Sequence, residues 1–277
     1  MNSKEGAVET GTVSTLGYTT HYYAAGEGRP LILIHGGGAG ADAWGNWGEK
    51  SLPLFARHFR TIAYDMVGFG RSSAPSPDGF HYDQNARIAQ LVALIENLDL
   101  GPVDIVGNSM GGATALGAAM VRPELVRSAV LMGSAGLNRG FNPALGAIVN
   151  YDFTVEGMRR MIAALTHDGF VPGEAMVAYR HELSCRPDIQ QAYRATMGWI
   201  KERGGLYYED DEIAQVKNRI LIFLGKDDKV VPMSEGFKFL ELLENSSGYF
   251  LDHCGHWAMI EHPQLFARIA IDFLKDA

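Results

Sequence analysis

The stretch Val103-Asp104-Ile105-Val106-Gly107-Asn108-Ser109-Met110-Gly111-Gly112 decides the fold, because an apolar run leads directly into a Gly-x-Ser-x-Gly motif. This motif is typical of a sharp turn between a strand and a helix, where glycines permit close backbone approach and the serine hydroxyl projects outward. The spacing predicts a helix from Met110 to about Val121, whose free N–H groups and positive dipole end face that hydroxyl. Ser109 is therefore a candidate nucleophile, and a purely structural turn is the alternative interpretation.

Short apolar runs bounded by Gly, Asp or Pro recur on either side of this motif. They are Leu31–Ile34, Thr61–Tyr64, Val103–Val106, Ala129–Met132, Ile220–Leu224 and Tyr249–Leu251. Helical spacing appears between them at Ile88, Leu91, Val92 and Ile95, and again at Phe266, Ile269 and Phe273. Apolar runs that alternate with helices indicate parallel strands covered on both faces. The sequence thus predicts an α/β fold with a mostly parallel central sheet and helices on both faces.

The middle of the chain has a different pattern. Residues 140–206 read as helices without an intervening strand run and are rich in Met, Tyr and Arg. Such insertions often act as lids over a site. We therefore expect residues 1–139 to form the first part of the core, 140–206 a helical lid, and 207–277 the second part of the core.

Composition narrows the function classes. The net charge is −8 with no basic stripe, which argues against a nucleic-acid partner. No apolar stretch approaches the roughly 18 residues of a membrane span, and the polar segment 1–15 has no apolar run typical of a signal peptide. The two cysteines, Cys185 and Cys254, lie far apart and suit free thiols in a reducing compartment, although a disulfide between them is also compatible with the sequence. We expect a cytoplasmic location.

A nucleophilic serine needs a base and an acid that orients the base. In an α/β sheet these partners are expected just past the carboxyl ends of later strands. Asp228 follows the run Ile220–Leu224, and His256 follows the run Tyr249–Leu251. The chain order Ser109, Asp228, His256 is the order of an α/β-hydrolase and predicts a catalytic triad.

Each role has a rival. His253 is an alternative base, but His256 follows a glycine and lies farther into its loop; Asp227 competes with Asp228, but the Gly-x-x-Asp-x-x-x-Pro spacing selects Asp228. Ser134 lacks the flanking spacing of the turn motif. The remaining histidines singled out are interpreted as surface or packing residues without metal-ligand spacing, so we expect no metal: His35, His58, His167, His181 and His262.

The tetrahedral intermediate of acyl transfer needs hydrogen-bond donors for its oxyanion. The run His35-Gly36-Gly37-Gly38 follows the predicted strand Leu31–Ile34 and offers backbone N–H groups free of side chains. We expect Gly37 and Gly38 to contribute one donor and the N–H of Met110, next to the nucleophile, to be the other. A merely flexible glycine loop is the alternative.

Longer motifs resemble those of a known family. They are His35-Gly-Gly-Gly-Ala-Gly-Ala-Asp-Ala-Trp44-Gly45-Asn46, Asp65-Met-Val-Gly-Phe-Gly70, Gly107-Asn-Ser-Met-Gly-Gly112, Gly225-Lys-Asp-Asp-Lys-Val-Val-Pro232 and Cys254-Gly-His-Trp257. Together they resemble the meta-cleavage product hydrolases, α/β-hydrolases that cut a carbon–carbon bond in ring-opened aromatic compounds. The resemblance covers nearly the whole chain, includes Asn150–Phe153 and Asp168–Phe170 in the predicted lid, and is strongest to the carbazole and dioxin-pathway branch.

The resemblance implies hydrolysis of 2-hydroxy-6-oxo-6-arylhexa-2,4-dienoates to 2-hydroxypenta-2,4-dienoate and an aryl carboxylate, without a cofactor. Ser109, with His256 as base, would attack the C6 carbonyl after ketonisation of the dienol. By the same resemblance Arg180 should grip the substrate carboxylate, with a solvated helix arginine as the alternative. Asn46, Asn108 and Trp257 match family positions around the dienoate. The partner is then a small anionic molecule, and the resemblance implies homo-oligomers.

Other functions would leave different sequences. A carboxylesterase would keep the triad and the oxyanion loop but would not need Arg180, Asn46 and Trp257 as a set. A haloalkane dehalogenase or epoxide hydrolase would have Asp at position 109, where this chain has Ser. A non-catalytic, ligand-binding protein of the same fold predicts a broken triad, whereas here the residues are intact.

Overall fold

The computed structural model describes residues 7–140 and 143–276. Its main element is an eight-stranded sheet in the order β1-β2-β4-β3-β5-β6-β9-β10. The strands are β1 (Glu9–Thr15), β2 (Tyr18–Ala25), β3 (Pro30–Ile34), β4 (Arg60–Tyr64), β5 (Val103–Asn108), β6 (Val126–Met132), β9 (Arg219–Gly225) and β10 (Ser246–Leu251). Strands β3 to β6, β9 and β10 pair in parallel, and β1 and β2 add an antiparallel edge. The predicted mostly parallel sheet is confirmed.

The register brings the ends of the central strands to one edge. Ile34 of β3 pairs with Gly107 of β5, and Met132 of β6 pairs with both Asn108 of β5 and Phe223 of β9. Parallel strands in this register deliver their following loops to the same side of the sheet. The loops that begin at residues 35, 109, 133 and 226 therefore meet in one region.

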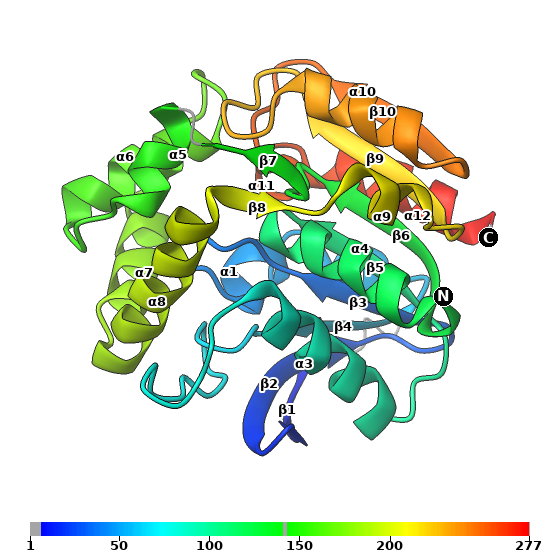
Figure 1. Cartoon of the computed structure of the whole chain (residues 1–277), viewed down its shortest axis with the longest axis horizontal. Coiled ribbons are helices and arrows are strands. Elements are labelled where there is room, and N and C mark those ends of the chain that lie inside the picture. Colours follow the sequence, from blue (N-terminus) through cyan, green and yellow to red (C-terminus); the bar gives the residue numbers. More distant parts are fainter. Residues whose placement is uncertain (1–6, 141–142, 277) are drawn as a thin grey trace.

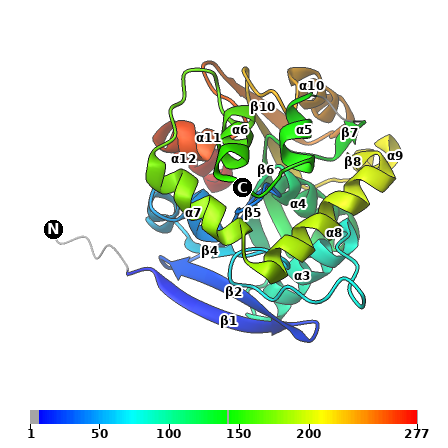
Figure 2. The same cartoon turned by 90° about the vertical axis from the view of Figure 1, so that its left-hand side faces the viewer.

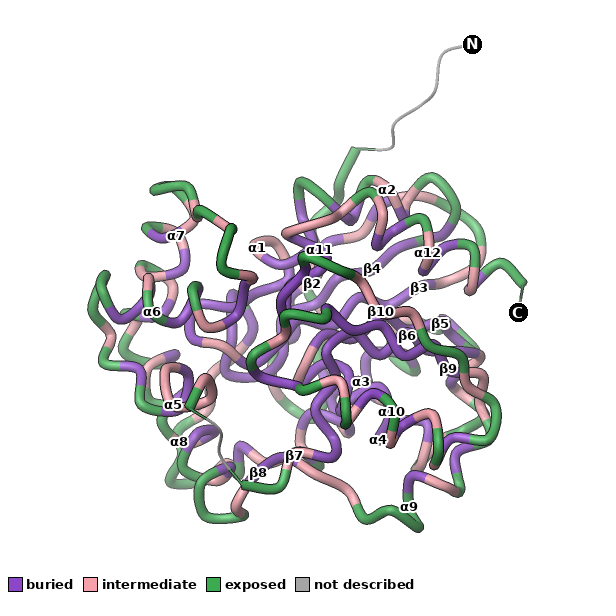
Figure 3. The backbone as a smooth tube through the Cα atoms, turned by 90° about the horizontal axis from the view of Figure 1, so that it is seen from above, coloured by how far each residue is buried: buried purple, intermediate pink, exposed green. Residues whose placement is uncertain are grey.

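Helices cover both faces of the sheet, as predicted (Figure 2). On one face lie α3 (Gln84–Asn97), α4 (Met110–Val121), α9 (Asp210–Ala214) and α10 (Met233–Leu242). On the other lie α1 (Ala43–Trp47), α2 (Leu52–Ala56), α11 (Ala258–Glu261) and α12 (Pro263–Lys275), all of which are labelled in Figure 3. A 3₁₀ turn, η1 (Pro123–Leu125), precedes β6. Helix α4 spans the range expected from the sequence and is buried along most of its length. In Figure 3 the central strands are almost wholly buried, whereas exposed residues lie on the outer helices and loops.

A group of helices is inserted in the chain between β6 and β9, two strands that pair directly in the sheet. Helices α5 (Pro143–Val149), α6 (Val155–Leu165), α7 (Glu174–Ser184) and α8 (Pro187–Arg203) pack together at one end of the sheet (Figure 1). A short antiparallel pair, β7 (Leu137–Arg139) and β8 (Gly205–Tyr207), joins this group to the core. These two strands are not predicted from the sequence, since pairing of such short segments depends on tertiary contacts rather than on their own residue pattern.

The structure also bears on the expectations for the cysteines and for membrane-spanning helices. Cys185 and Cys254 are both free thiols, as expected, with Cys185 exposed and Cys254 buried. Within the described ranges, no helix has the length and apolarity to cross a membrane.

Candidate active site

Ser109 occupies a strained turn between β5 and α4. Its φ of +56° lies in the left-handed region that non-glycine residues rarely adopt, and its N–H donates to Met132 O at 3.0 Å. The neighbouring glycines are required by space: a Cβ on Gly107 would lie 2.4 Å from Gly111 O, and one on Gly111 would lie 2.5 Å from Ile34 O. The predicted turn is confirmed, and it holds the Ser109 side chain in the lining of a pocket.

His256 and Asp228 form a buried pair at the same edge of the sheet. Nδ1 of His256 lies 2.7 Å from Oδ2 of Asp228. The other carboxylate oxygen, Oδ1, accepts from the N–H groups of Val230 at 2.8 Å and Val231 at 2.9 Å. An ionised carboxylate can only accept hydrogen bonds, so Nδ1 of His256 must carry the proton of this bond. The other ring nitrogen, Nε2, then carries a free lone pair.

The free nitrogen of His256 is available to the pocket. Nε2 is buried and has no hydrogen-bond partner among the described residues. His256 and Ser109 line the same pocket, so a base and a hydroxyl face one cavity. Hydrogen bonds of this kind are often long without substrate and tighten on binding.

The rivals considered from the sequence lie elsewhere. The His253 side chain is 83% exposed, and Asp227 is also exposed. Ser134 is buried, and its hydroxyl donates to the carbonyl of Ala135 at 2.7 Å. None of these side chains is among the residues that line the Ser109 pocket.

Gly37, Gly38 and Met110 come together beside Ser109. All three line the pocket, and a Cβ on Gly37 would lie 2.3 Å from Cε of Met110. Met110 begins α4, and the first N–H groups of a helix have no acceptor within the helix. The loop and the start of α4 therefore lie together in the lining of the Ser109 pocket.

The His35 ring holds this loop in place through hydrogen bonds to the backbone of Gly36 and Met66. The ring is fully buried, its Nε2 accepts from the N–H of Met66 at 3.0 Å, and its Nδ1 donates to Gly36 O at 2.7 Å. Burial lowers the pKa of His35 to about 4, so the ring is neutral near pH 7. The sequence analysis treats His35 as a surface or packing residue; it is a packing residue, and its contact with Gly36 fixes the orientation of the peptide that precedes Gly37.

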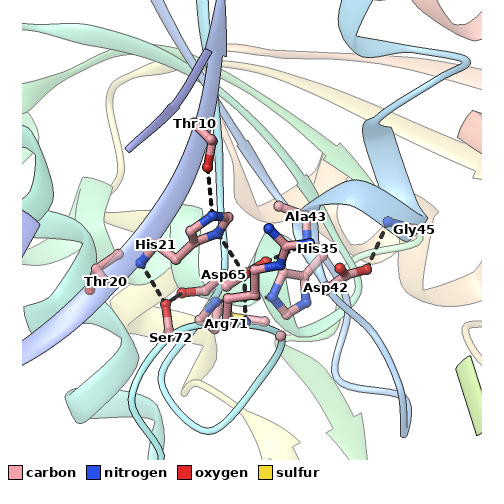
Figure 4. Close-up of polar contacts among 12 residues, drawn as sticks. Thr10, Thr20, His21, His35, Asp42, Ala43, Gly45, Asp65, Arg71 and Ser72 are labelled. Atoms are coloured by element: carbon pink, nitrogen blue, oxygen red, sulfur yellow. Dashed lines mark hydrogen bonds and ion pairs between the residues drawn. The ribbon is translucent and has the colours of Figure 1, made fainter. Parts of the chain in front are cut away.

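Asp65 ties the neighbouring segments together (Figure 4). Its carboxylate accepts from Ala43 N at 2.7 Å and Arg71 N at 2.8 Å, and lies 3.0 Å from Nδ1 of His21. Asp42 lies beside this cluster and caps α1 by accepting from Gly45 N at 2.7 Å. The backbone after β3 and β4 is thereby held by buried polar contacts.

Arg180 lies at the interface of α7 with α1. It is buried, in contrast to a solvated helix arginine, and its Nη2 donates to Gly45 O at 3.2 Å and Asn46 Oδ1 at 3.0 Å. Its guanidinium carbon stacks 4.3 Å from the ring centroid of Trp257. Nε and Nη1 have no hydrogen-bond partner among the described residues. Burial lowers the pKa of Arg180 to about 10, so this cation stays charged at neutral pH.

The residues expected around a substrate are split between two hollows. Asn108 and Trp257 line the Ser109 pocket, whereas Asn46 and Arg180 line a neighbouring hollow between α1 and α7. Trp257 connects the two, because its indole lies in the pocket lining and also stacks on Arg180.

Asn108 is tied to the backbone of the site. Its Nδ2 donates to Met132 O at 3.1 Å and His256 O at 3.3 Å, which leaves Oδ1 buried without a partner among the described residues. Asn108 therefore braces the histidine loop and retains one unused acceptor.

One residue beside His256 and Asp228, Gly133, was not predicted from the sequence to belong to the site. Gly133 has a φ of +50°, and a Cβ there would lie 2.9 Å from Nδ1 of His256 and 3.1 Å from Oδ2 of Asp228. Any side chain would collide with that pair. Its signal in the sequence is its place directly after the apolar run that forms β6.

Comparisons with known proteins give matches over most of the chain. Residues 29–263 match the family model of the alpha/beta hydrolase fold. A 2-hydroxy-6-oxo-6-(2'-aminophenyl)hexa-2,4-dienoic acid hydrolase from Metapseudomonas resinovorans is 49% identical over 95% of this chain and 90% of that relative. A 2-hydroxy-6-oxo-6-phenylhexa-2,4-dienoate hydrolase from Comamonas testosteroni is 32% identical over 93% of this chain and 92% of its own. The crystal structure of a serine hydrolase involved in carbazole degradation superposes with a TM-score of 0.90 at 47% identity, covering 98% of this chain and 100% of that one.

Proposed function

Because the chain belongs to the alpha/beta hydrolase fold family and, within it, to the meta-cleavage product hydrolases, we propose that it hydrolyses 2-hydroxy-6-oxo-6-arylhexa-2,4-dienoates at a carbon–carbon bond. Water is consumed, and 2-hydroxypenta-2,4-dienoate and an aryl carboxylate are formed. The observation that carries this proposal is that Ser109 and His256 line one largely apolar pocket. Trp257 of the same lining stacks on Arg180, whose buried guanidinium has two nitrogens without a hydrogen-bond partner among the described residues.

Ser109 is the proposed nucleophile. Nε2 of His256 would take the hydroxyl proton as the oxygen attacks the C6 carbonyl, and Asp228 would stabilise the imidazolium through Nδ1. The N–H groups of Gly37 and Met110 would then receive the oxyanion, with Gly38 completing the loop. One such donor is worth about 2.7–4 kcal/mol in the barrier of acyl-transfer enzymes.

The leaving group decides what else the site must do. A carbanion is a poor leaving group, so the dienol must first become a ketone, whose carbonyl accepts the electron pair when the C–C bond breaks. His256 is the proposed carrier of the proton in that ketonisation. Water then releases the acyl group from Ser109 as a carboxylate, which restores the serine hydroxyl.

The substrate carboxylate is proposed to bind at Arg180. The N–H groups of Nε and Nη1 have no partner among the described residues and can each donate to a carboxylate oxygen, while Asn46 accepts from Nη2 and holds the guanidinium in place. For the carboxylate to reach it from the Ser109 pocket, the indole of Trp257 must turn or the carboxylate must pass its edge. The free Oδ1 of Asn108 would accept from the dienol hydroxyl.

The remaining assignments are proposals of the same kind. Helices α5 to α8 would act as a lid within residues 140–206. The protein would work in the cytoplasm as a homo-oligomer, which sedimentation at working concentration would test.

The test compares two substrates in the purified protein. A phenyl-substituted dienoate is coloured and a nitrophenyl ester releases a coloured product, so both reactions can be followed by absorbance. We expect dienoate turnover to exceed ester turnover in kcat/KM and both to be lost in Ser109→Ala. Rapid ester hydrolysis with the dienoate left coloured would instead identify a carboxylesterase.

A further inference from the structure

The wall of the Ser109 pocket formed by β7, α5, α8 and β8 is almost entirely apolar. Among its described residues, every side chain but one is aliphatic or a thioether, and the exception is Asn138 of β7. The other polar lining residues come from the loops that carry Ser109 and His256. If the substrate is bound as proposed above, with its carboxylate toward Arg180 and C6 at Ser109, its aryl ring occupies this apolar part.

Asn138 is held by an acidic residue from behind. Its Nδ2 donates to Oε1 of Glu235 at 3.0 Å, and the two residues are 97 positions apart in the sequence. Oε2 of Glu235 is buried and has no partner among the described residues. Glu235 lies in the first turn of α10, where the helix dipole favours a negative charge.

The carboxylate decides which way the Asn138 amide faces. An ionised carboxylate can only accept, so the NH₂ group must turn toward Glu235 and the carbonyl oxygen away from it. With Nδ2 held by Glu235, Oδ1 is the atom of this pocket-lining side chain that is left to accept from a ligand. An acceptor in an apolar wall favours a ligand that brings a donor and disfavours one that leaves it unpaired.

Few charges act on Glu235. Asp228, in the loop after β9, and Lys238, on α10 itself, are the charged groups that influence it, and Lys238 also pairs with Asp210 of α9 at 2.7 Å. Asp228 is in turn bonded to His256. Burial, followed by repulsion from Asp228, raises the pKa of Glu235 to about 7.

We propose that Asn138 and Glu235 form a subsite that selects substrates whose aryl ring carries a hydrogen-bond donor, such as an amino or hydroxyl group. Asn138 contacts the ring substituent through Oδ1, and Glu235 is a positioning residue that sets the orientation of the amide. This inference rests on the proposed function, since it assigns the ring to this part of the pocket.

Matched pairs of substrates test the subsite. Aryl dienoates with an amino or a methyl group at the 2', 3' or 4' ring position differ little in size but differ in donor capacity. For wild type we expect kcat/KM to favour the amino compound about five- to tenfold in at least one pair, the ratio that one net hydrogen bond supports. Asn138→Leu should abolish that preference.

Glu235→Gln is the second variant, and its side chain has nearly the same size and shape as that of the glutamate. A glutamine can donate to Oδ1 of Asn138 and let the amide turn, so the preference should fall toward unity. The preference in wild type should also weaken as the pH drops below about 7 and stay constant in Glu235→Gln, because a ratio of two substrates cancels any pH dependence that both reactions share. The inference is overturned if no pair shows a preference, or if the preference survives both variants. Failure of the proposed function is distinguishable, since every dienoate would then remain uncleaved.

Discussion

Nδ1 of His256 lies 2.7 Å from Oδ2 of Asp228, and each side chain is 1% exposed. The second oxygen of Asp228 is bonded to two consecutive backbone N–H groups, those of Val230 and Val231. The carboxylate is thus fixed in place at both oxygens. It holds the histidine ring in the tautomer that leaves Nε2 free to accept a proton.

Asp228→Asn should reverse that tautomer. The N–H groups of Val230 and Val231 would still bind the amide oxygen, so the NH₂ group would face His256. An NH₂ group cannot accept a hydrogen bond from Nδ1–H. The ring would then carry its proton on Nε2 and could not activate Ser109. We expect kcat on a dienoate to fall about 10⁴-fold, the size of the same change in a serine protease. An unchanged melting temperature would show that the fold is intact; a loss below about tenfold would contradict the role of Asp228.

His35 should make stability depend on pH. Its folded pKa of about 4 lies below the ordinary 6.5, so the unfolded chain binds the proton more tightly. The stabilisation by the neutral ring is therefore complete above pH 6.5 and is lost as the pH falls toward 4. At 1.36 kcal/mol per pKa unit, the loss is about 3 kcal/mol.

The variant that isolates this effect is His35→Gln, which keeps a donor and an acceptor but does not titrate. We expect the difference in free energy of unfolding between wild type and variant to change by about 3 kcal/mol in favour of wild type from pH 4 to pH 7. Asp42, whose pKa burial raises to about 6, titrates in both proteins and cancels. If urea unfolding gave the same difference in free energy between wild type and His35→Gln at pH 4 and at pH 7, the lowered pKa of His35 would be contradicted.

Arg180→Ala should separate charged from uncharged substrates. Loss of a charged hydrogen-bond donor is worth about 1.5–3 kcal/mol, so kcat/KM for a dienoate should fall about 10- to 150-fold. An uncharged nitrophenyl ester should lose far less. The matched control is Arg159→Ala, since Arg159 is another arginine of the helical insertion but pairs with Glu174 at the surface. Equal losses on both substrates would remove the proposed carboxylate role.

The oxyanion loop can be tested by adding one methyl group. Gly37→Ala would place Cβ 2.3 Å from Cε of Met110, whereas at Gly38 the nearest contact is an ordinary 3.5 Å to Sδ of Met161. We expect Gly37→Ala to lower kcat about 10- to 100-fold on dienoate and ester alike, and Gly38→Ala to lower it less. Met110→Ala, combined with Gly37→Ala, should recover part of the loss. Full activity of Gly37→Ala would contradict the expectation that this contact with Met110 constrains the loop.

Much of the core could be predicted from the sequence because its strands are apolar on both faces. The runs at Leu31–Ile34 and Val103–Val106 are wholly buried in β3 and β5, and helix α4 has the predicted bounds. The hairpin of β1 and β2 was not predicted: it forms the sheet edge, and most residues of β1 are exposed or only partly buried. Edge pairing of this kind is set by the neighbouring strand rather than by an apolar run.

The site residues also fall into those that could be predicted from the sequence and those that could not. Ser109, Asp228 and His256 were predicted because each follows a strand, and strand ends converge. Contacts between side chains that are distant in the sequence were not, and the bond between Asn138 and Glu235, 97 positions apart, is the clearest case. The burial of Arg180 behind Trp257 likewise depends on how α7 packs on α1, which no local pattern encodes.

The most direct test of carbon–carbon hydrolysis at Ser109 is product analysis after incubation with 2-hydroxy-6-oxo-6-phenylhexa-2,4-dienoate, by chromatography with mass detection. Wild type should give benzoate and 2-hydroxypenta-2,4-dienoate in equal amounts, and Ser109→Ala should give neither at a rate above about one thousandth of wild type. Recovery of the intact dienoate from the wild-type reaction, or equal product formation by Ser109→Ala, would contradict the account.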